Sequence, residues 1–375
     1  MKLFYITAYL PTSIGEVPVA DSKLNFKDRF GALMVRLAFY RNSYKVNPGL
    51  YAVGNPDGAS DVFVTANYKL SFDHLRKNLD ELNAWILVLD TRGINVWCAA
   101  GKGTFSTTEL VNRIRLSRLS EIINHRKIIV PQLGATGISA HKVEQLTANA
   151  AAQSILSNPS LSNTAAFVPD PVSLNPEPGF KVIYGPVKAS DIKEFVRKKH
   201  HSTKEMRKVS FNLVDRLKLI PVDLVMGSYK LLAVMAVFFI LSAINKGEFS
   251  LHDAIDKGLL SILIIGSGYV SGLVLTPIFL PFIPGRSFSL KGFLMGIITS
   301  ALLLLFNKLG NTYLEMISWS LIISGISSFT AMNFTGSSTF TSLSGVKIEM
   351  KIAIPFQISL TSVGLVLFVV VKFIN

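Results

Sequence analysis

The stretch from residue 258 to residue 285 carries no charged side chain, and this run constrains the fold more than any other feature of the sequence. A helix needs roughly 20 apolar residues to cross a hydrocarbon core about 30 Å thick. The run is longer than that, and almost every other long uncharged segment also lies beyond residue 220. The carboxyl-terminal part of the chain is therefore expected to be a membrane domain.

Five segments of this part are long and apolar enough to span a bilayer. They lie near residues 222–244, 259–281, 290–307, 314–335 and 352–373. The third is the weakest, because only residues 292–307 of it are free of charge. We predict an all-α transmembrane domain of five helices over residues 216–375, preceded by a domain over residues 1–215 that mixes apolar and charged positions.

Basic residues set the expected orientation of these spans. They are densest from Lys181 to Lys218, directly before the first apolar segment. Such a cluster is typical of a cytoplasmic flank near anionic lipid, so we expect a multi-pass protein of the cell (inner) membrane with a cytoplasmic amino-terminal domain. The first residues lack a long apolar run with a cleavage site, so no cleaved signal peptide is expected. The net charge of +14 does not indicate nucleic-acid binding, because no recognition motif accompanies it.

The predicted spans contain no cysteine or histidine and no interior carboxylate. A channel or pump for soft metal ions or protons usually needs such groups, which argues against a transporter. Lys230 in the first span is more simply a snorkelling lysine than a pathway residue. The hydroxyl-rich stretch "MNFTGSSTFTSLSG" at 332–345 indicates either close helix packing or a polar surface for a ligand.

The first 215 residues show the alternation of strands and helices that is typical of an α/β domain. Buried strands are indicated by "AWILVLDTRG" at 84–93, "KIIVPQLGATG" at 127–137 and "FKVIYGP" at 180–186. Ser106 and Glu109 form a capping box for a helix through about Ile123, a helix follows residue 138, and Ser190 is the expected cap of a third helix. The proline-rich residues 168–179 are expected to be a surface connection. This order predicts a doubly wound, Rossmann-like α/β domain with ligands at the carboxyl ends of its strands.

The chain contains one cysteine, Cys98, which excludes an internal disulfide and any cysteine-ligated iron–sulfur cluster within this chain alone. It follows the turn after the strand at 84–89, so it is expected near the ligand-binding rim, although a lone cysteine is more often a small buried hydrophobe. The pattern also allows the strand to continue through Trp97. The "LGATG" loop by itself is weak evidence for a phosphate or nucleotide site.

Several motifs resemble one known family over nearly the whole chain. They are "PGLYAVGNP" at 48–56, "LDTRGINVWCAAGKGTF" at 89–105, "PQLGATGISAHKV" at 131–143, "VIYGPVKASDIKEF" at 182–195 and "MNFTGSSTFTSLSGVKIEM" at 332–350. They look like the membrane-anchored corrinoid protein of microbial mercury methylation, whose hallmark is the octet "NVWCAAGK" at 95–102. The soluble half is similar to the corrinoid-binding domain of the corrinoid iron–sulfur protein of the acetyl-CoA pathway.

The resemblance implies a bound cobalamin or related corrinoid, with Cys98 as the lower axial ligand of its cobalt and as the catalytic residue. It also places the octet on a short cap helix. Asn95 is expected to hydrogen-bond near the thiolate, and small residues are expected to let the ring approach. The implied cofactor-binding residues are Asn95, Val96, Trp97, Cys98, Ala99, Ala100, Gly101, Lys102, Gly103, Gly134, Thr136 and Gly137. His141 is either a corrin contact or an ordinary helix-surface histidine.

The implied activity is a corrinoid methyltransferase that transfers a methyl group to Hg(II), giving methylmercury. The implied partners are a ferredoxin-like protein with two [4Fe-4S] clusters as the reductant, and a methyltetrahydrofolate-dependent methyl donor. Two alternatives stay open. One is a corrinoid methyl carrier for acetyl-CoA or other one-carbon metabolism, and the other is a membrane-tethered binding module without chemistry. Because the predicted spans lack thiols, Hg(II) is expected to arrive from the cytoplasmic side.

Overall fold

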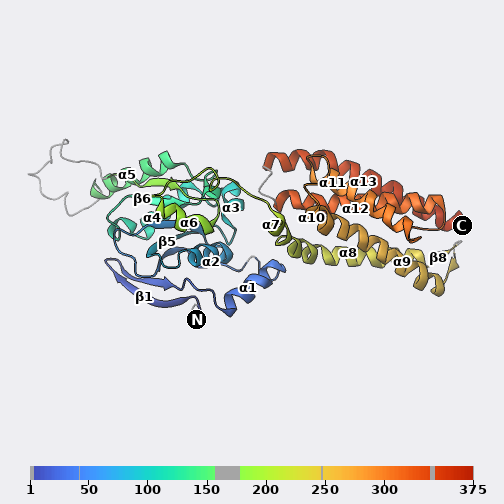
Figure 1. Ribbon diagram of the computed structural model, residues 1–375, viewed down its shortest axis with the longest axis horizontal. Helices are drawn as coiled ribbons and strands as arrows, with labels where there is room; N and C mark the ends of the chain where they lie inside the picture. The colour runs from blue at the N-terminus through green and yellow to red at the C-terminus, as the bar shows by residue number, and fades with distance from the viewer. Residues whose placement is uncertain (1–3, 42, 157–177, 246–247, 338–342, 375) are drawn as a thin grey trace, which may run out of the picture. The chain divides into compact units, whose positions relative to one another are not determined.

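The computed structural model describes residues 4–41, 43–156, 178–245, 248–337 and 343–374 (Figure 1). The chain divides into two compact units, Met1–Val35 with Tyr40–Val209, and Arg36–Phe39 with Ser210–Asn375. Residues 168–177 of the expected proline-rich connection and residues 338–342 of the hydroxyl-rich stretch lie outside the described residues.

The first unit contains a seven-stranded mixed sheet. In sheet order its strands are β1 (Ile6–Thr12), β2 (Gly15–Ala20), β3 (Gly49–Val53), β5 (Ala84–Leu89), β4 (Val62–Ala66), β6 (Lys127–Val130) and β7 (Lys181–Tyr184). Strands β5, β4, β6 and β7 are parallel to one another. Strand β3 is antiparallel to β5, and β1 pairs with β2 as an antiparallel hairpin. The predicted α/β architecture is thus observed, with an antiparallel extension that the sequence patterns did not indicate.

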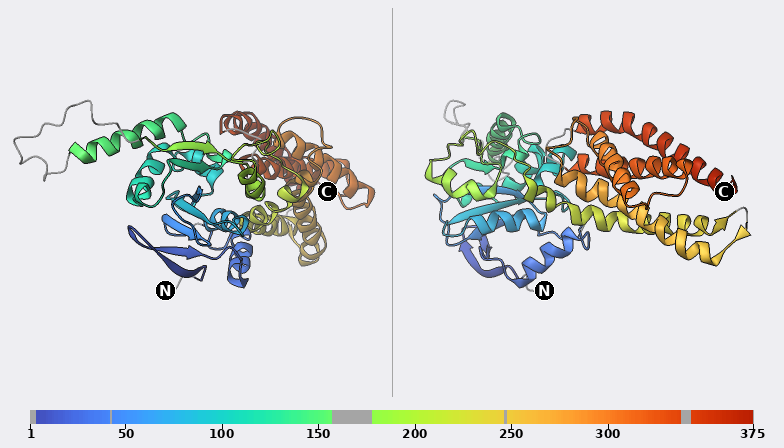
Figure 2. Two further views of the ribbon diagram at one scale, coloured as in Figure 1. Left: turned by 60° about the vertical axis from the view of Figure 1, so that its left-hand side comes forward. Right: turned by 45° about the vertical axis from the view of Figure 1, so that its right-hand side comes forward.

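Helices cover both faces of the sheet (Figure 2). On one face Val64 of β4 belongs to the core that contains Leu110 of α4 (Thr107–Leu116). On the other face Phe63 belongs to the core that contains Phe72 of α2 (Lys69–Asn78). Neighbouring residues of a strand point to opposite faces, so the fully buried strand β4 supplies both cores. Helix α5 (Ala140–Leu156) packs on β7, and α6 (Ile192–Arg197) adds Phe195 to the Phe72 core.

The connections between the parallel strands reverse their direction across the sheet at one point. They follow one another in the chain as β4, β5, β6 and β7, whereas their order in the sheet is β5, β4, β6, β7. The connections therefore diverge on either side of the β4–β6 pair. In open α/β sheets ligands bind outside the carboxyl ends of the strands at such a switch point, so this edge is where the structure favours a binding site.

Several local predictions are confirmed and two are wrong. A strand lies within each of the apolar runs at 84–93, 127–137 and 180–186, as predicted. Ser106 caps α4, because its side chain accepts a hydrogen bond from the Glu109 amide. The helix ends at Leu116 rather than near Ile123, because the chain turns at Arg118, whose φ is 44°, into a 3₁₀ turn. Ser190 does not cap α6, since it lies inside a 3₁₀ turn and its hydroxyl contacts Asp191.

The second unit is helical and also contains two antiparallel strands of two residues each, β8 (Ile244–Asn245) and β9 (Glu248–Phe249). Its helices are α7 (Leu213–Leu217), α8 (Ile220–Ser242), α9 (Leu251–Val270), α10 (Thr276–Ile278), α11 (Phe288–Leu305), α12 (Tyr313–Ser337) and α13 (Leu343–Ile374). A π-helical segment, Ser271–Leu275, joins α9 to α10. In the described residues five helical stretches are long and apolar enough to cross a membrane: Leu213–Ser242, Leu251–Ile278, Phe288–Leu305, Tyr313–Phe334 and Gly345–Ile374. Each predicted segment falls on one of them.

Glycine and hydroxyl side chains bring these helices close together. A Cβ atom on Gly292 would lie 2.5 Å from the Ser327 carbonyl oxygen, so only glycine fits there. The Ser327 hydroxyl donates a hydrogen bond to the Gly292 carbonyl oxygen at 2.6 Å. The Thr299 hydroxyl donates to the Ser271 hydroxyl at 3.0 Å. Small residues and interhelical hydrogen bonds are the usual means of helix association in lipid. Close packing therefore accounts for the small polar residues of α11 and α12.

Candidate functional site at the carboxyl edge of the sheet

The octet at 95–102 forms a short, capped helix, α3 (Val96–Lys102). Asn95 is its N-cap, and the Asn95 side-chain oxygen accepts a hydrogen bond from the Cys98 amide at 2.9 Å. Gly103 ends the helix in the left-handed region, with φ 79°. Asparagine and glycine are favoured at these two positions. A strand through Trp97 is therefore wrong, and the octet forms a short helix, as the family resemblance implied.

Cys98 is a free, partly exposed cysteine. The alternative of a buried cysteine that merely fills the core is wrong. Helix α3 has an inner and an outer side. Val96, Ala99 and Ala100 are buried in the core, so the small alanines serve packing on the sheet rather than the approach of a ring. The remaining residues of the octet and its cap are exposed or partly exposed, namely Asn95, Trp97, Cys98, Gly101, Lys102 and Gly103.

The glycine loop lies against the inner side of α3. Gly134 ends a 3₁₀ turn, Gln132–Gly134, that contacts α3, and a Cβ there would meet the Phe105 ring at 2.4 Å. A Cβ on Gly137 would lie 2.0 Å from the Phe105 carbonyl oxygen and 3.1 Å from the Ala100 Cα. Both glycines are therefore required by packing, and Thr136 between them is exposed. The loop supports the helix that presents Cys98.

Asn67 organises the turn ahead of α3 and was missed by the sequence reasoning. It follows β4 directly, is 2% exposed, and its side-chain oxygen accepts hydrogen bonds from the amides of Thr91 at 3.1 Å and Gly93 at 2.9 Å. Its amide nitrogen donates to Asp90 at 3.0 Å. A polar residue directly after a buried strand was the available signal, because such positions lie at the switch point. Asn67 thus fixes the path of the chain from β5 into α3.

Histidines and carboxylates do not form a metal cage in the part of the chain that the structure describes, where no group of three or more potential ligands lies together. His141 is exposed near the start of α5, which favours its interpretation as a helix-surface histidine. His200 is paired with Asp61 at 2.8 Å.

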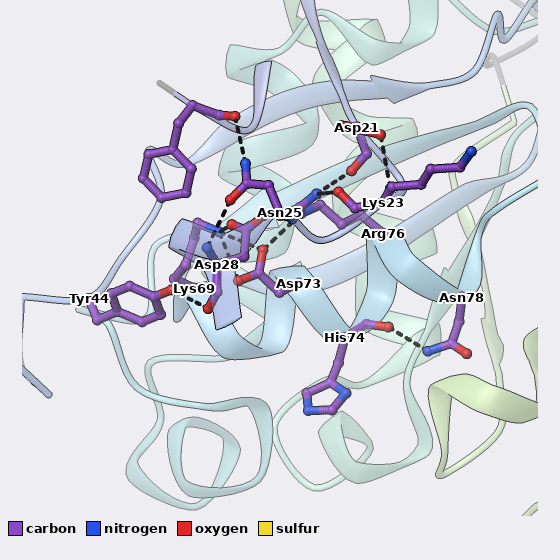
Figure 3. A network of polar contacts seen from close by, with 11 residues as sticks. Asp21, Lys23, Asn25, Asp28, Tyr44, Lys69, Asp73, His74, Arg76 and Asn78 are labelled. Carbon is purple, nitrogen blue, oxygen red and sulfur yellow. Dashed lines mark hydrogen bonds and ion pairs between the residues drawn. The ribbon is translucent and has the colours of Figure 1, made fainter. Parts of the chain in front are cut away.

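A buried group of four charges lies elsewhere in the α/β unit (Figure 3). It joins α1 (Phe26–Arg36) to α2, and its members are at most 4% exposed. The Lys69 ammonium lies 2.7 Å from Asp28 and 2.6 Å from Asp73, and the Arg76 guanidinium lies 2.7 Å from Asp28 and 2.8 Å from Asp73. Burial alone raises the pKa of Asp28, but the hydrogen bonds and charges of Lys69 and Arg76 outweigh it, so this pKa lies below its usual range.

The second unit contains a cavity of about 780 Å³ between α8, α9, α12 and α13. Its wall is mainly apolar, with Lys230 and Asp223 of α8 and Gln357 of α13 among the polar residues. Asn333, from the hydroxyl-rich stretch, also lines it. Lys230 lines this cavity and is itself exposed, so both of the alternatives for this residue stay open.

Comparisons with known proteins concern the α/β unit. Residues 30–159 match the family described as CO dehydrogenase/acetyl-CoA synthase delta subunit. The chain is 31% identical over 97 residues to the acetyl-CoA decarbonylase/synthase complex subunit gamma of Archaeoglobus fulgidus, covering 25% of this chain and 21% of that protein. It is 33% identical over 109 residues to the same subunit of Methanocaldococcus jannaschii, covering 28% of this chain and 22% of that protein. The chain thus spans about a fifth of the length of these relatives.

The matched segment contains α3, the glycine loop and Asn67. The expected similarity of the soluble half to proteins of acetyl-CoA metabolism is confirmed by these comparisons. The residues that match the family end at 159, before the five apolar helices.

Proposed function

We propose that this protein is a membrane-anchored corrinoid-dependent methyltransferase that transfers a methyl group to Hg(II), with Cys98 as the lower axial ligand of cobalt. The observation that carries the proposal is the presentation of a partly exposed cysteine on a short capped helix at the carboxyl edge of the parallel strands. The similarity to acetyl-CoA decarbonylase/synthase subunits supports the corrinoid, and the octet at 95–102 supports the acceptor.

The residues of α3 fit such a group. One sulfur donor suits a metal whose other positions are filled by a macrocycle, and coordination itself deprotonates a thiol, so no separate base is needed. Asn95 uses its side-chain oxygen to hold the Cys98 amide, which fixes the first turn of the helix under the sulfur. A Cβ on Gly103 would meet nothing within 4 Å, so space is open beside the helix end. We propose that Trp97, Lys102 and Thr136 line the same space, because they are partly or fully exposed.

A bound methylcorrinoid would supply the methyl group, and the Cys98 thiolate that would hold it donates electron density, which would make the methyl group a better donor to an electrophile. The chain's own contribution is to hold the sulfur at a fixed place on a rigid sheet edge. Low-valent cobalt would have to be restored by an outside reductant, which we propose is the ferredoxin-like partner with two [4Fe-4S] clusters. A methyltetrahydrofolate-dependent protein is the proposed methyl donor.

The Rossmann-like nature of the α/β unit, the boundary near residue 215, and the membrane location are parts of the same proposal. The β5-β4-β6-β7 order with helices on both faces supports the first, and five apolar helices support a multi-pass protein of the cell membrane. Basic residues from Lys181 to Lys218 precede these helices and support a cytoplasmic α/β unit.

A second candidate function is a corrinoid methyl carrier for acetyl-CoA or other one-carbon metabolism. The similarity to these relatives favours it, because they are subunits of an acetyl-CoA decarbonylase/synthase complex. The two candidates share the cofactor and differ in the methyl acceptor. They are therefore separated by the acceptor that takes the methyl group and not by cofactor binding.

The test is a single turnover with the full chain in detergent or nanodiscs, loaded with isotopically labelled methylcobalamin. Hg(II) as a bis-thiolate complex and acetyl-CoA decarbonylase/synthase are offered as separate acceptors. The proposal predicts about one labelled methylmercury per bound methyl group, and a large loss of rate in both Cys98→Ser and Cys98→Ala. Cys98→Ser preserves size and the Asn95 cap, so it isolates the thiolate. Transfer to the acetyl-CoA enzyme without transfer to Hg(II) would establish the carrier instead.

A further inference from the structure

Helix α1 presents a stripe of large apolar side chains away from its domain. Phe26, Phe30 and Leu33 are 79%, 51% and 50% exposed. Their spacing of four and three residues puts them on one face of the helix. The rings of Phe26 and Phe30 stack with their centroids 6.0 Å apart, so the stripe is continuous. We name Phe26, Phe30 and Leu33 the α1 stripe.

The α1 stripe is a concentration of apolar surface and not a scatter of single residues. Phe39 and Tyr40, just after the helix, are also more than half exposed. In the remaining described residues from 46 to 209, the large hydrophobic side chains that are exposed are Leu116 and Leu146, on separate helices. Contiguous exposed apolar surface of this kind marks an interaction site, whereas isolated residues need no explanation.

Positive charge accompanies the stripe. Residues 26–45 contain five basic residues, Lys27, Arg29, Arg36, Arg41 and Lys45, and one acidic residue, Asp28. Lys27, Arg29 and Arg41 are exposed, while Asp28 is 1% exposed and neutralised by Lys69 and Arg76. Within residues 26–45 the accessible charge is therefore entirely positive. Basic residues near an anionic lipid surface are attracted to it, and their contributions add.

The opposite side of α1 is fixed to the domain by the buried charges. Asn25 and Asp28 exchange hydrogen bonds between side chain and amide at 3.0 Å in both directions, which sets the start of the helix. Asp28 is then held by Lys69 and Arg76 of α2 (Figure 3). Breaking such a buried pair costs several kcal/mol, so the helix cannot rotate to bury its stripe. The apolar face is a permanent feature of the folded domain.

We propose that α1 docks on the surface of an anionic phospholipid bilayer, with the α1 stripe at the boundary between headgroups and acyl chains and with Lys27 and Arg29 among the phosphates. A helix with an aromatic face and a basic face is suited to this position. The proposal rests on the proposed membrane insertion of the second unit. That tether keeps a bilayer within reach of the domain at all times, so even weak surface binding is populated. Together the two attachments restrict the rotation of the α/β unit that carries Cys98.

The test measures the depth of a spin label in the full chain. Cys98 is the sole cysteine, so a Cys98→Ser background allows one label at Leu33→Cys, with Leu116→Cys, 71% exposed on α4, as the matched control. In nanodiscs that contain phosphatidylglycerol, the label at residue 33 should be relaxed more by oxygen than by an aqueous nickel chelate. The label at residue 116 should show the reverse. A label at 33 that is as accessible to nickel as the control, or is shielded from both reagents as in a protein contact, would overturn the proposal.

Charge reversal supplies an independent arm. Lys27→Glu with Arg29→Glu changes two exposed side chains and leaves the buried network intact, so the melting temperature should stay the same. The proposal predicts that the depth signal at residue 33 is lost in this variant, and also in nanodiscs of phosphatidylcholine alone. An unchanged depth signal in both cases would contradict it. Because no readout depends on methyl transfer, failure here is distinguishable from failure of the proposed activity.

Discussion

Gly137 is predicted to control the position of Cys98 without touching it. In Gly137→Ala the new methyl group would lie 2.0 Å from the backbone oxygen of Phe105 and 3.1 Å from the Ala100 Cα. Neither atom belongs to a flexible side chain, so the loop and α3 must move apart. The Thr107 amide also donates to the Gly137 carbonyl at 3.1 Å, which links the loop to α4. Overpacking of this kind costs about 1–3 kcal/mol, and we expect the upper end of that range.

Gly103 provides the matched control. An alanine there meets no atom within 4 Å, but the residue has φ 79°, so the cost is conformational and is about 1–2 kcal/mol. Thr136→Ala, at an exposed position of the same loop, should change stability by less than about 0.5 kcal/mol. The expected order of destabilisation is therefore residue 137, then 103, then 136.

Native-state hydrogen exchange of the full chain gives the free energies. The amides of β5 and β6 report opening of the α/β core, and their exchange should quicken most in Gly137→Ala. Cobalamin affinity should fall in the same variant, because α3 is displaced. If Gly137→Ala exchanged like the parent protein, or if Gly103→Ala were the more destabilised variant, the packing account of the glycine loop would be refuted.

Three further predictions concern the buried charges and the helix cap. Arg76→Met should destabilise the α/β unit by about 3–5 kcal/mol, because it removes one of the two cations that neutralise Asp28 and Asp73. Hydrogen exchange measures this change, and a loss of stability below about 1 kcal/mol would show that the network is dispensable. Since the pKa of Asp28 is lowered in the fold, its contribution to stability is complete above the pKa of the unfolded carboxyl, near 3.9, and is lost as the pH falls through the folded pKa. The stability gap between the parent and Asp28→Asn should therefore narrow in acid, and a constant gap would contradict the ion pairs. Asn95→Ala should lower the stability of the α/β unit by about 1 kcal/mol and weaken cobalamin binding. Asn95→Asp keeps the capping oxygen, so it should retain both the stability and the cobalamin affinity. Equal behaviour of the two variants would exclude the cap role.

Local chemistry explains which features the sequence could predict. The strands at 84, 127 and 181 are short apolar runs bounded by turn residues, and the helix after Ser106 begins with a cap that acts only on its neighbours. The apolar helices were predictable because each is a long, almost uncharged run of apolar residues. In each case the signal and the structure that it specifies occupy the same stretch of chain.

Features that depend on distant residues could not be predicted in this way. The buried charges join Asp28 to residues 69–76, and no local pattern marks that pairing. Asn67 acts on the turn at 90–94 from the end of another strand. The Gly134 and Gly137 positions suggested a ligand loop, whereas their actual neighbours, Phe105 and Ala100, are more than 25 residues away in the sequence. Knowledge of the sheet order was needed for all of these.

Ligation of cobalt by Cys98 is the central claim, and the absorption and EPR spectra of the full chain reconstituted with cobalamin test it most directly. Wild type and Cys98→Ala are compared under the same conditions. The account predicts a sulfur-ligated, base-off spectrum in the wild type that is absent in Cys98→Ala, because the sulfur of α3 is partly exposed and free to bind. If both proteins gave the same cobalamin spectrum, Cys98 would not be the ligand. If neither bound cobalamin, the corrinoid function itself would be contradicted.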